Sequence, residues 1–168
     1  GNFILRLAKS HPEYEWIFKP HPVFKDRVLR YKIKTLSEIE AYFAEWEQLG
    51  TVYSGGDYYE MFAGSDYLIT DCISFLSEYL PTGKPVIHLR KDKYIEEFND
   101  LLNVITDSYY KVYNNDMLLS VFNDVIVNNN DYLRNERIKN ISLLNIIQNK
   151  TTGEKITEYL EKELWQRG

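Results

Sequence analysis

Several features that define other protein classes are missing from this chain of 168 residues. Its single cysteine, Cys72, cannot form an internal disulfide, which favours a reducing compartment. No apolar run approaches the roughly 20 residues that a membrane span requires, and no signal-peptide pattern opens the sequence. The Walker loop and the Gly-x-Gly-x-x-Gly fingerprint are also absent. These absences lead us to expect a cytoplasmic globular protein.

Positive charge is scarce over the chain as a whole. Lys and Arg number 20 against 25 Asp and Glu, so the net charge is −5 and the isoelectric point is about 5.3. Non-specific nucleic-acid binding needs a basic face that displaces phosphate counterions, so we expect no nucleic-acid partner. Basic residues do gather in one stretch, residues 19–34. The three histidines have no metal-ligand spacing, and we expect no metal.

Short apolar segments alternate with helical patterns through the first half of the chain. The segments with the composition of buried strands are 16–18, 51–53, 67–70 and 85–89. Such alternation predicts right-handed βαβ units and a parallel sheet. The second half is mostly helical, with residues 110–113 as a fifth, edge strand. The sequence therefore predicts a Rossmann-like, doubly wound α/β domain over residues 1–168, with four or five strands and helices on both faces.

Several residues mark the ends of the expected helices. Ser37 followed by Glu40 predicts a capping box at the start of a helix that carries aromatic residues on one face. Gly50 and Gly83 follow two helical segments and predict their C-terminal stops.

Ligands of an open parallel sheet bind outside the carboxyl ends of its strands. The segments that follow the expected strands are 19–22, 54–57, 70–74 and 88–91. Folding would bring them to one edge of the sheet, and this convergence is the main argument from the residues for a binding site. Ser54 begins a Ser-Gly-Gly turn whose backbone could approach a base or a phosphate, with a simple tight turn as the alternative.

The third of these segments has the polar groups suited to a phosphorylated nucleoside. Thr70 and Asp71 end the strand, and Ser74 places a hydroxyl where the next helix begins and its free N–H groups attract phosphate. Glu78 lies one turn further on the same face, where its carboxylate could accept hydrogen bonds from ribose hydroxyls. The competing interpretation is a helix capped by Asp71 or Ser74, with Glu78 in solvent.

Two prolines flank His21 and exclude regular structure around it. An imidazole held there, at the end of a strand, could bind a phosphate oxygen or stabilise charge on a leaving group. Lys19 would be a second cation at the same place. A turn histidine satisfied by the backbone, beside a solvated lysine, is the alternative.

These segments together resemble a known family. FKPHP at residues 18–22 is followed by SDYLITD at 65–71, by Ser74 and Glu78, and by GKPVI at 83–87. This pattern resembles the CDP-glycerol glycerophosphotransferases, which build the poly(glycerol phosphate) chains of teichoic acids and related capsule polymers. The resemblance covers about half of the chain.

The sequence departs from the family's pattern directly after the third strand. Cys72 stands where the family usually has tyrosine, and Ile73 where it has the first of two serines. Losing this serine removes a hydroxyl that could contact a phosphate, so the identity of the donor is left open.

The resemblance implies one half of a GT-B enzyme, in which this chain is the C-terminal, nucleotide-donor-binding domain of a larger protein. The catalytic base, and the site for a polymer or lipid-linked acceptor, would lie on an upstream domain, so we expect the isolated chain to be inactive. No cofactor is implied beyond the nucleotide-linked donor. The full-length protein could associate peripherally with the inner face of the plasma membrane. The site residues that we predict are His21 as the catalytic group, and Lys19, Ser54, Thr70, Asp71, Ser74 and Glu78 as donor ligands.

Two other functions fit parts of the pattern. A glutamate on a helix before a Gly-Lys-Pro strand is similar to that of GT-B glycosyltransferases that use UDP-, GDP- or CMP-sugars, and of UDP-sugar 2-epimerases, where it holds the ribose. A non-catalytic Rossmann-like interaction domain is the third alternative. A receiver-type domain would need a cluster of acidic residues that Asp71 alone does not supply.

Overall fold

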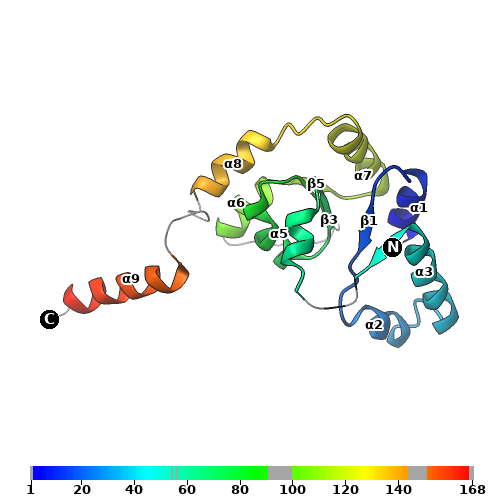
Figure 1. The fold of residues 1–168 in the computed structure, drawn as a ribbon, viewed down its shortest axis with the longest axis horizontal. Helices are drawn as coiled ribbons and strands as arrows, with labels where there is room; N and C mark the ends of the chain where they lie inside the picture. Colours follow the sequence, from blue (N-terminus) through cyan, green and yellow to red (C-terminus); the bar gives the residue numbers. More distant parts are fainter. Residues whose placement is uncertain (1, 54, 56, 91–99, 144–150, 167–168) are drawn as a thin grey trace. The chain divides into compact units, whose positions relative to one another are not determined.

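A computed structural model describes residues 2–53, 55, 57–90, 100–143 and 151–166 of the chain (Figure 1). The chain divides into two compact units, Gly1–Glu60 and Met61–Gly168, which are described one at a time. Of the helices in these described ranges, none is long and apolar enough to cross a bilayer.

The first unit contains a two-stranded parallel sheet and three helices, followed by the start of a fourth. Its elements are α1 (Asn2–Ser10), β1 (Trp16–Phe18), α2 (Phe24–Arg30), α3 (Leu36–Leu49), β2 (Gly50–Val52) and α4 (Tyr59–Gly64), which runs across the boundary between the units. In the sheet, Phe18 lies opposite Val52, so both strands end at the same edge.

Aromatic side chains form the core of this unit. Phe18 stacks on Trp46 with ring centroids 4.9 Å apart and meets Tyr42 edge-on at 5.7 Å. Leu5 and Ala8 of α1 are buried in the same cluster. Aromatic pairs in these geometries add to the free energy gained from burial alone. The cluster therefore anchors β1 between α1 and α3.

The start of α3 corrects one sequence prediction. The capping box is formed by Thr35 and Glu38, not by Ser37 and Glu40. The Thr35 hydroxyl accepts a hydrogen bond from Glu38 N, and the Glu38 carboxylate accepts one from Thr35 N. That backbone hydrogen bond is the main reason why the pKa of Glu38 is lowered. The helix begins at Leu36 because extended Thr35 is the residue that can cap it.

The second unit contains a three-stranded parallel sheet with the order β3-β4-β5. Its strands are β3 (Leu68–Thr70), β4 (Val86–Leu89) and β5 (Tyr110–Val112). Its other elements are α5 (Ile73–Tyr79), the 3-10 turn η1 (Leu80–Thr82), α6 (Asp100–Asp107), α7 (Asn115–Val121), the π-helix η2 (Phe122–Val127), α8 (Arg134–Leu143) and α9 (Thr152–Gln166). β5 is the edge strand that the sequence predicted.

Packing in the second unit is centred on β4. Val86, Ile87 and His88 are all buried, as expected of a central strand. α7 packs against β4 and β5, α5 against α6, and α6 against α8. Gly83 has a left-handed backbone (φ 70°) and ends the turn η1, as predicted.

The predicted fold class, a Rossmann-like α/β fold with parallel strands, is confirmed. The strands form a two-stranded and a three-stranded sheet within the described residues, where the sequence predicted a single sheet of four or five strands. Strands of three or four residues make few ladder hydrogen bonds, and patterns this short do not specify which strands are neighbours. The organisation of residues 1–168 as one donor-binding domain stays a prediction.

Candidate functional site

Lys19 follows β1 directly, and tyrosines from the segment after β2 surround its ammonium group. Lys19 Nζ lies 5.0 Å from the ring centroid of Tyr58 and 5.8 Å from that of Tyr53. The Tyr53 hydroxyl donates a hydrogen bond to the carbonyl of Asp57, and the Asp57 carboxylate accepts one from Tyr59 N at 2.9 Å. The segment after β2 is thus folded against a half-buried cation, where the sheet ends.

His21 is exposed and held by its own turn. Val23 N donates a hydrogen bond to His21 Nδ1 at 3.2 Å, and Phe24 N donates one to the His21 carbonyl at 2.8 Å. Because Nδ1 accepts, a neutral imidazole must carry its proton on Nε2. The side chain therefore presents an N–H donor from a turn whose backbone is fixed by prolines.

The structure extends the sequence prediction at the end of the two-stranded sheet. It brings Lys19 together with Tyr53 and Tyr58, which sequence reasoning did not assign to the site. Ser54 was predicted as a donor ligand and lies outside the described residues. Residues 53–59 are rich in tyrosine and follow the end of a strand. That composition could have indicated aromatic rings at the site.

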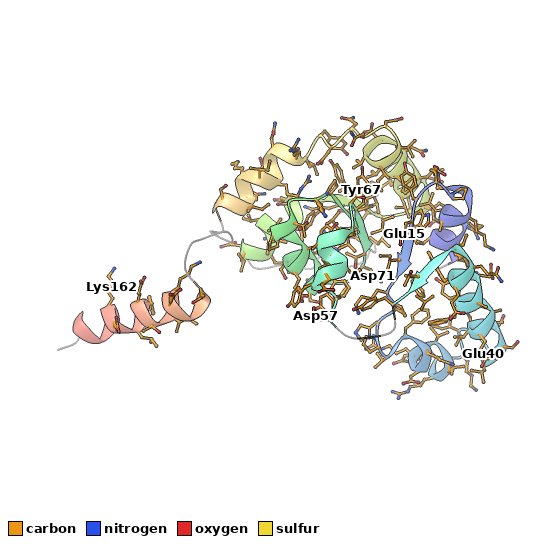
Figure 2. All side chains as sticks on the ribbon, in the orientation of Figure 1. Glu15, Glu40, Asp57, Tyr67, Asp71 and Lys162 are labelled. Carbon is orange, nitrogen blue, oxygen red and sulfur yellow. The ribbon has the colours of Figure 1, made fainter. Side chains whose placement is uncertain are left out.

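In the second unit, Thr70 ends β3 and its side chain is buried. The Thr70 hydroxyl accepts a hydrogen bond from Cys72 N at 3.0 Å, which fixes the turn into α5. Asp71 lies exposed on this turn (Figure 2). Its carboxylate makes no hydrogen bond or ion pair to another described residue.

The helix α5 carries the remaining predicted ligands, Ser74 at its start and Glu78 near its end. Cys72 is the N-cap residue and makes no capping hydrogen bond, and Ser74 Oγ lies 3.2 Å from Cys72 Sγ. Neither Asp71 nor Ser74 therefore caps α5, contrary to the competing interpretation. Glu78 is half-buried and follows Ser74 by four residues, on the same face of the helix.

A row of polar residues, two of them buried and one half-buried, crosses the three-stranded sheet beside this turn. Thr70 lies opposite His88 on β4, and His88 lies opposite Lys111 on β5. His88 is 3% exposed, and no described residue is a hydrogen-bond partner for its Nδ1. The pKa of His88 is lowered to about 4, chiefly by burial and also by the positive charges of Arg90 and Lys111, against the opposing effect of Asp71. The imidazole is therefore neutral at physiological pH.

A buried arginine supports the loop before β4, and sequence reasoning did not identify it. The Arg137 side chain is fully buried in α8, donates from Nε to the Gly83 carbonyl at 2.8 Å and pairs with Asp131. Asp131 also accepts a hydrogen bond from the Tyr110 hydroxyl at 2.7 Å. This network joins η1, β5 and α8, so the Gly-Lys-Pro loop depends on residues some 50 positions away.

The predicted site residues thus form two groups, each at the carboxyl end of parallel strands. Lys19 and His21 belong to the first unit, and Thr70, Asp71 and Ser74 to the second. Glu78 lies one helical turn beyond the second group. No cluster of three potential metal ligands occurs among the residues that the structure describes.

The chain was compared with known proteins. A family model described as CDP-Glycerol:Poly(glycerophosphate) glycerophosphotransferase matches residues 4–162, nearly the whole sequence. Neither the comparison with curated proteins nor the comparison with solved structures found a match. The family match extends well beyond the segments that carry the motifs and includes the helical second half.

Proposed function

This chain belongs to the CDP-glycerol:poly(glycerophosphate) glycerophosphotransferase family, and on that premise we propose that it binds the nucleotide-linked donor of such a transferase. The family is one of transferases. The observation that carries the proposal is the position of the predicted residues within the matched region. Lys19 follows β1 directly, Thr70 ends β3, and Ser74 lies at the start of the helix that comes next, at the strand ends where parallel sheets bind ligands.

The proposed reaction is transfer of glycerol phosphate from CDP-glycerol. An acceptor hydroxyl forms a new P–O bond to the β-phosphorus, the bond to the bridging oxygen breaks, and CMP leaves with the electron pair. Negative charge on the diphosphate must be balanced as this bond breaks, so positioning and charge stabilisation dominate the catalysis.

Five of the predicted residues have a role in this proposal. His21 donates from Nε2 to a diphosphate oxygen, and Lys19 supplies positive charge beside it. Ser74 adds a hydroxyl donor, and Glu78 accepts hydrogen bonds from the ribose hydroxyls. Thr70 acts through the turn that its hydroxyl holds to Cys72 N, so it positions Asp71 and Ser74 and needs no contact with the donor.

The other half of the reaction belongs to a second domain in this proposal. A GT-B arrangement would place the catalytic base and the site for a polymer or lipid-linked acceptor on an upstream domain, in the cytoplasm. Turnover of CDP-glycerol by the isolated chain would contradict this part of the proposal, while leaving donor binding intact.

Calorimetric titration with CMP, CDP, UDP and GDP tests the function. We expect a preference for cytidine nucleotides, and loss of about tenfold or more in affinity for CDP in Glu78→Ala, because hydrogen bonds to a charged group contribute about 1.5–3 kcal/mol. Glu40→Ala is the matched control, since Glu40 is an exposed glutamate on α3 (Figure 2). Preference for UDP would favour a nucleotide-sugar transferase. Absence of binding at millimolar nucleotide would refute donor binding by this chain.

A further inference from the structure

Arg90 directly follows β4, the central strand of the three-stranded sheet, and the proposed function gives it no role. Its backbone N–H donates a hydrogen bond to the Val112 carbonyl at 2.8 Å, which continues the pairing of β4 with β5 by one residue. Arg90 is half-buried. Its backbone is therefore fixed at the carboxyl edge of the sheet, where parallel sheets bind ligands.

A tyrosine from the neighbouring strand end lies against the Arg90 side chain. Tyr113 directly follows β5, and the guanidinium carbon of Arg90 lies 5.9 Å from the centroid of its ring. A guanidinium within about 6 Å of an aromatic ring is attracted to the face of that ring. Because both residues follow strands, the ring holds the guanidinium near the carboxyl edge of the sheet. Lys19 and Tyr58 form the same kind of pair in the first unit.

Arg90 shares this edge with the predicted donor ligands of the second unit. Thr70 ends β3 and lies opposite His88 on β4, so the residues that follow both strands leave the sheet at one edge. Asp71 lies there on the turn into α5 (Figure 2). The pKa of His88 is lowered chiefly by burial, is also lowered by Arg90, and is raised by Asp71. Both charges therefore act on the same imidazole, which agrees with their common position.

The predicted ligands of the second unit bring negative charge without positive charge. Asp71 and Glu78 are carboxylates, whereas Thr70 and Ser74 are hydroxyls. Two carboxylates would repel a diphosphate at this edge unless a cation offset them. Arginine is suited to that role, because its planar guanidinium presents N–H donors in a fork that matches two phosphate oxygens. Arg90 places such a group at the end of the central strand.

We propose that Arg90 binds the diphosphate of the nucleotide-linked donor and that Tyr113 positions its guanidinium for this contact. This inference rests on the proposed function and adds a phosphate ligand to its site. The guanidinium donates two hydrogen bonds to diphosphate oxygens and offsets the charge of Asp71 and Glu78. When the bond to the bridging oxygen breaks, the same cation stabilises the negative charge on the departing CMP. Tyr113 acts through Arg90 and makes no contact with the donor.

Calorimetric titration of the whole chain with CDP and with CMP tests the proposal. We expect Arg90→Gln to bind CDP about tenfold or more weakly than wild type, because hydrogen bonds to charged groups are the strong ones. The loss should be larger for CDP than for CMP, since attraction to a cation grows with the charge of the ligand. Arg90→Lys keeps the charge and should recover part of the affinity. The matched control is Arg134→Gln, which removes an exposed arginine of the same unit and changes the net charge equally.

Variants of Tyr113 test the positioning role. Tyr113→Leu removes the ring and should weaken CDP binding about threefold, the size expected of one partly exposed cation–π contact. Tyr113→Phe keeps the ring and should bind CDP as wild type does. Adding Tyr113→Leu to Arg90→Gln should cause no further loss, because the ring then has no guanidinium to position. Thermal unfolding of each variant confirms that it is folded.

The outcomes distinguish this inference from the proposed function. If wild type binds CDP and Arg90→Gln binds it equally well, donor binding stands and the inference is overturned. Equal losses for CDP and CMP in Arg90→Gln, or a loss of the same size in Arg134→Gln, would also overturn it. If wild type binds neither nucleotide, the proposed function fails and the inference fails with it.

Discussion

Lowering the pH from 7 to 4 should destabilise this chain through one buried imidazole, that of His88. Its side chain is 3% exposed, and no described residue bonds to its Nδ1. The charged groups that act on it are Arg90, Lys111 and, with the opposite sign, Asp71. Protonation would place a positive charge in a buried position that two cations already influence, so the folded state takes up this proton only at low pH.

The sign and size of the effect follow from the two pKa values. The unfolded imidazole binds a proton near pH 6.5, and the folded one only near a pKa of about 4. Between these values the unfolded state binds more protons, so the free energy of unfolding falls as the pH falls. Each pKa unit corresponds to about 1.4 kcal/mol, so the full difference approaches about 3 kcal/mol. The contribution is complete above pH 6.5 and is lost progressively toward pH 4.

Guanidinium unfolding followed by far-UV circular dichroism at several pH values measures this. Carboxylates also titrate in this range, so the informative quantity is the difference between wild type and His88→Gln, in which only the imidazole is lost. We expect His88→Gln to be less stable than wild type at pH 7. The difference in free energy of unfolding, wild type minus variant, should fall by about 3 kcal/mol between pH 7 and pH 4. Parallel stability curves would refute the reasoning. So would an NMR titration in which the His88 ring protonates near pH 6.5.

Three further changes test other parts of the structure. Gly50→Ala should cost about 3 kcal/mol in chemical denaturation, because a Cβ there would lie 2.0 Å from the Trp16 carbonyl oxygen and force β1 from β2; a cost below about 1 kcal/mol would contradict that close approach. Lys32→Gly should raise stability by about 0.5 kcal/mol, since it relieves a left-handed backbone; a loss of stability would argue against the φ of 51°. Asp131→Asn should lower the free energy of unfolding by about 3 kcal/mol, because it leaves the buried Arg137 charge uncompensated. Adding Arg137→Met should recover part of this loss. Equal or greater destabilisation in the double variant would contradict a buried ion pair.

The local pattern of the sequence was sufficient for the strands and for the residues that follow them. Apolar runs bounded by turn residues predicted β1 and β4, and even the edge strand β5 was found, because strand patterns are local. The same holds for the stop at Gly83, where one backbone conformation favours glycine. Lys19 and Asp71 directly follow strands and Thr70 ends one, as predicted, since that relation is fixed by chain order.

What sequence reasoning missed depends on contacts between distant residues. α2 was not predicted, because a seven-residue helix without a side-chain cap leaves little local signal after two prolines. The burial of His88 follows from the central position of β4, which chain order does not reveal. The contacts of Lys19 with Tyr53 and Tyr58 depend on the parallel pairing of β1 with β2. Neither could be derived from spacing along the chain.

The buried Arg137 bears on how deletion experiments on this family should be interpreted. Its Nε donates a hydrogen bond to the Gly83 carbonyl, and its partner Asp131 accepts one from the Tyr110 hydroxyl. One side chain of α8 therefore stabilises the loop before β4. A chain shortened to end before α8 would lose that support, although it kept every residue predicted to contact the donor. Loss of nucleotide binding on such a truncation would therefore report a loosened loop, and would not locate the nucleotide in the deleted helix.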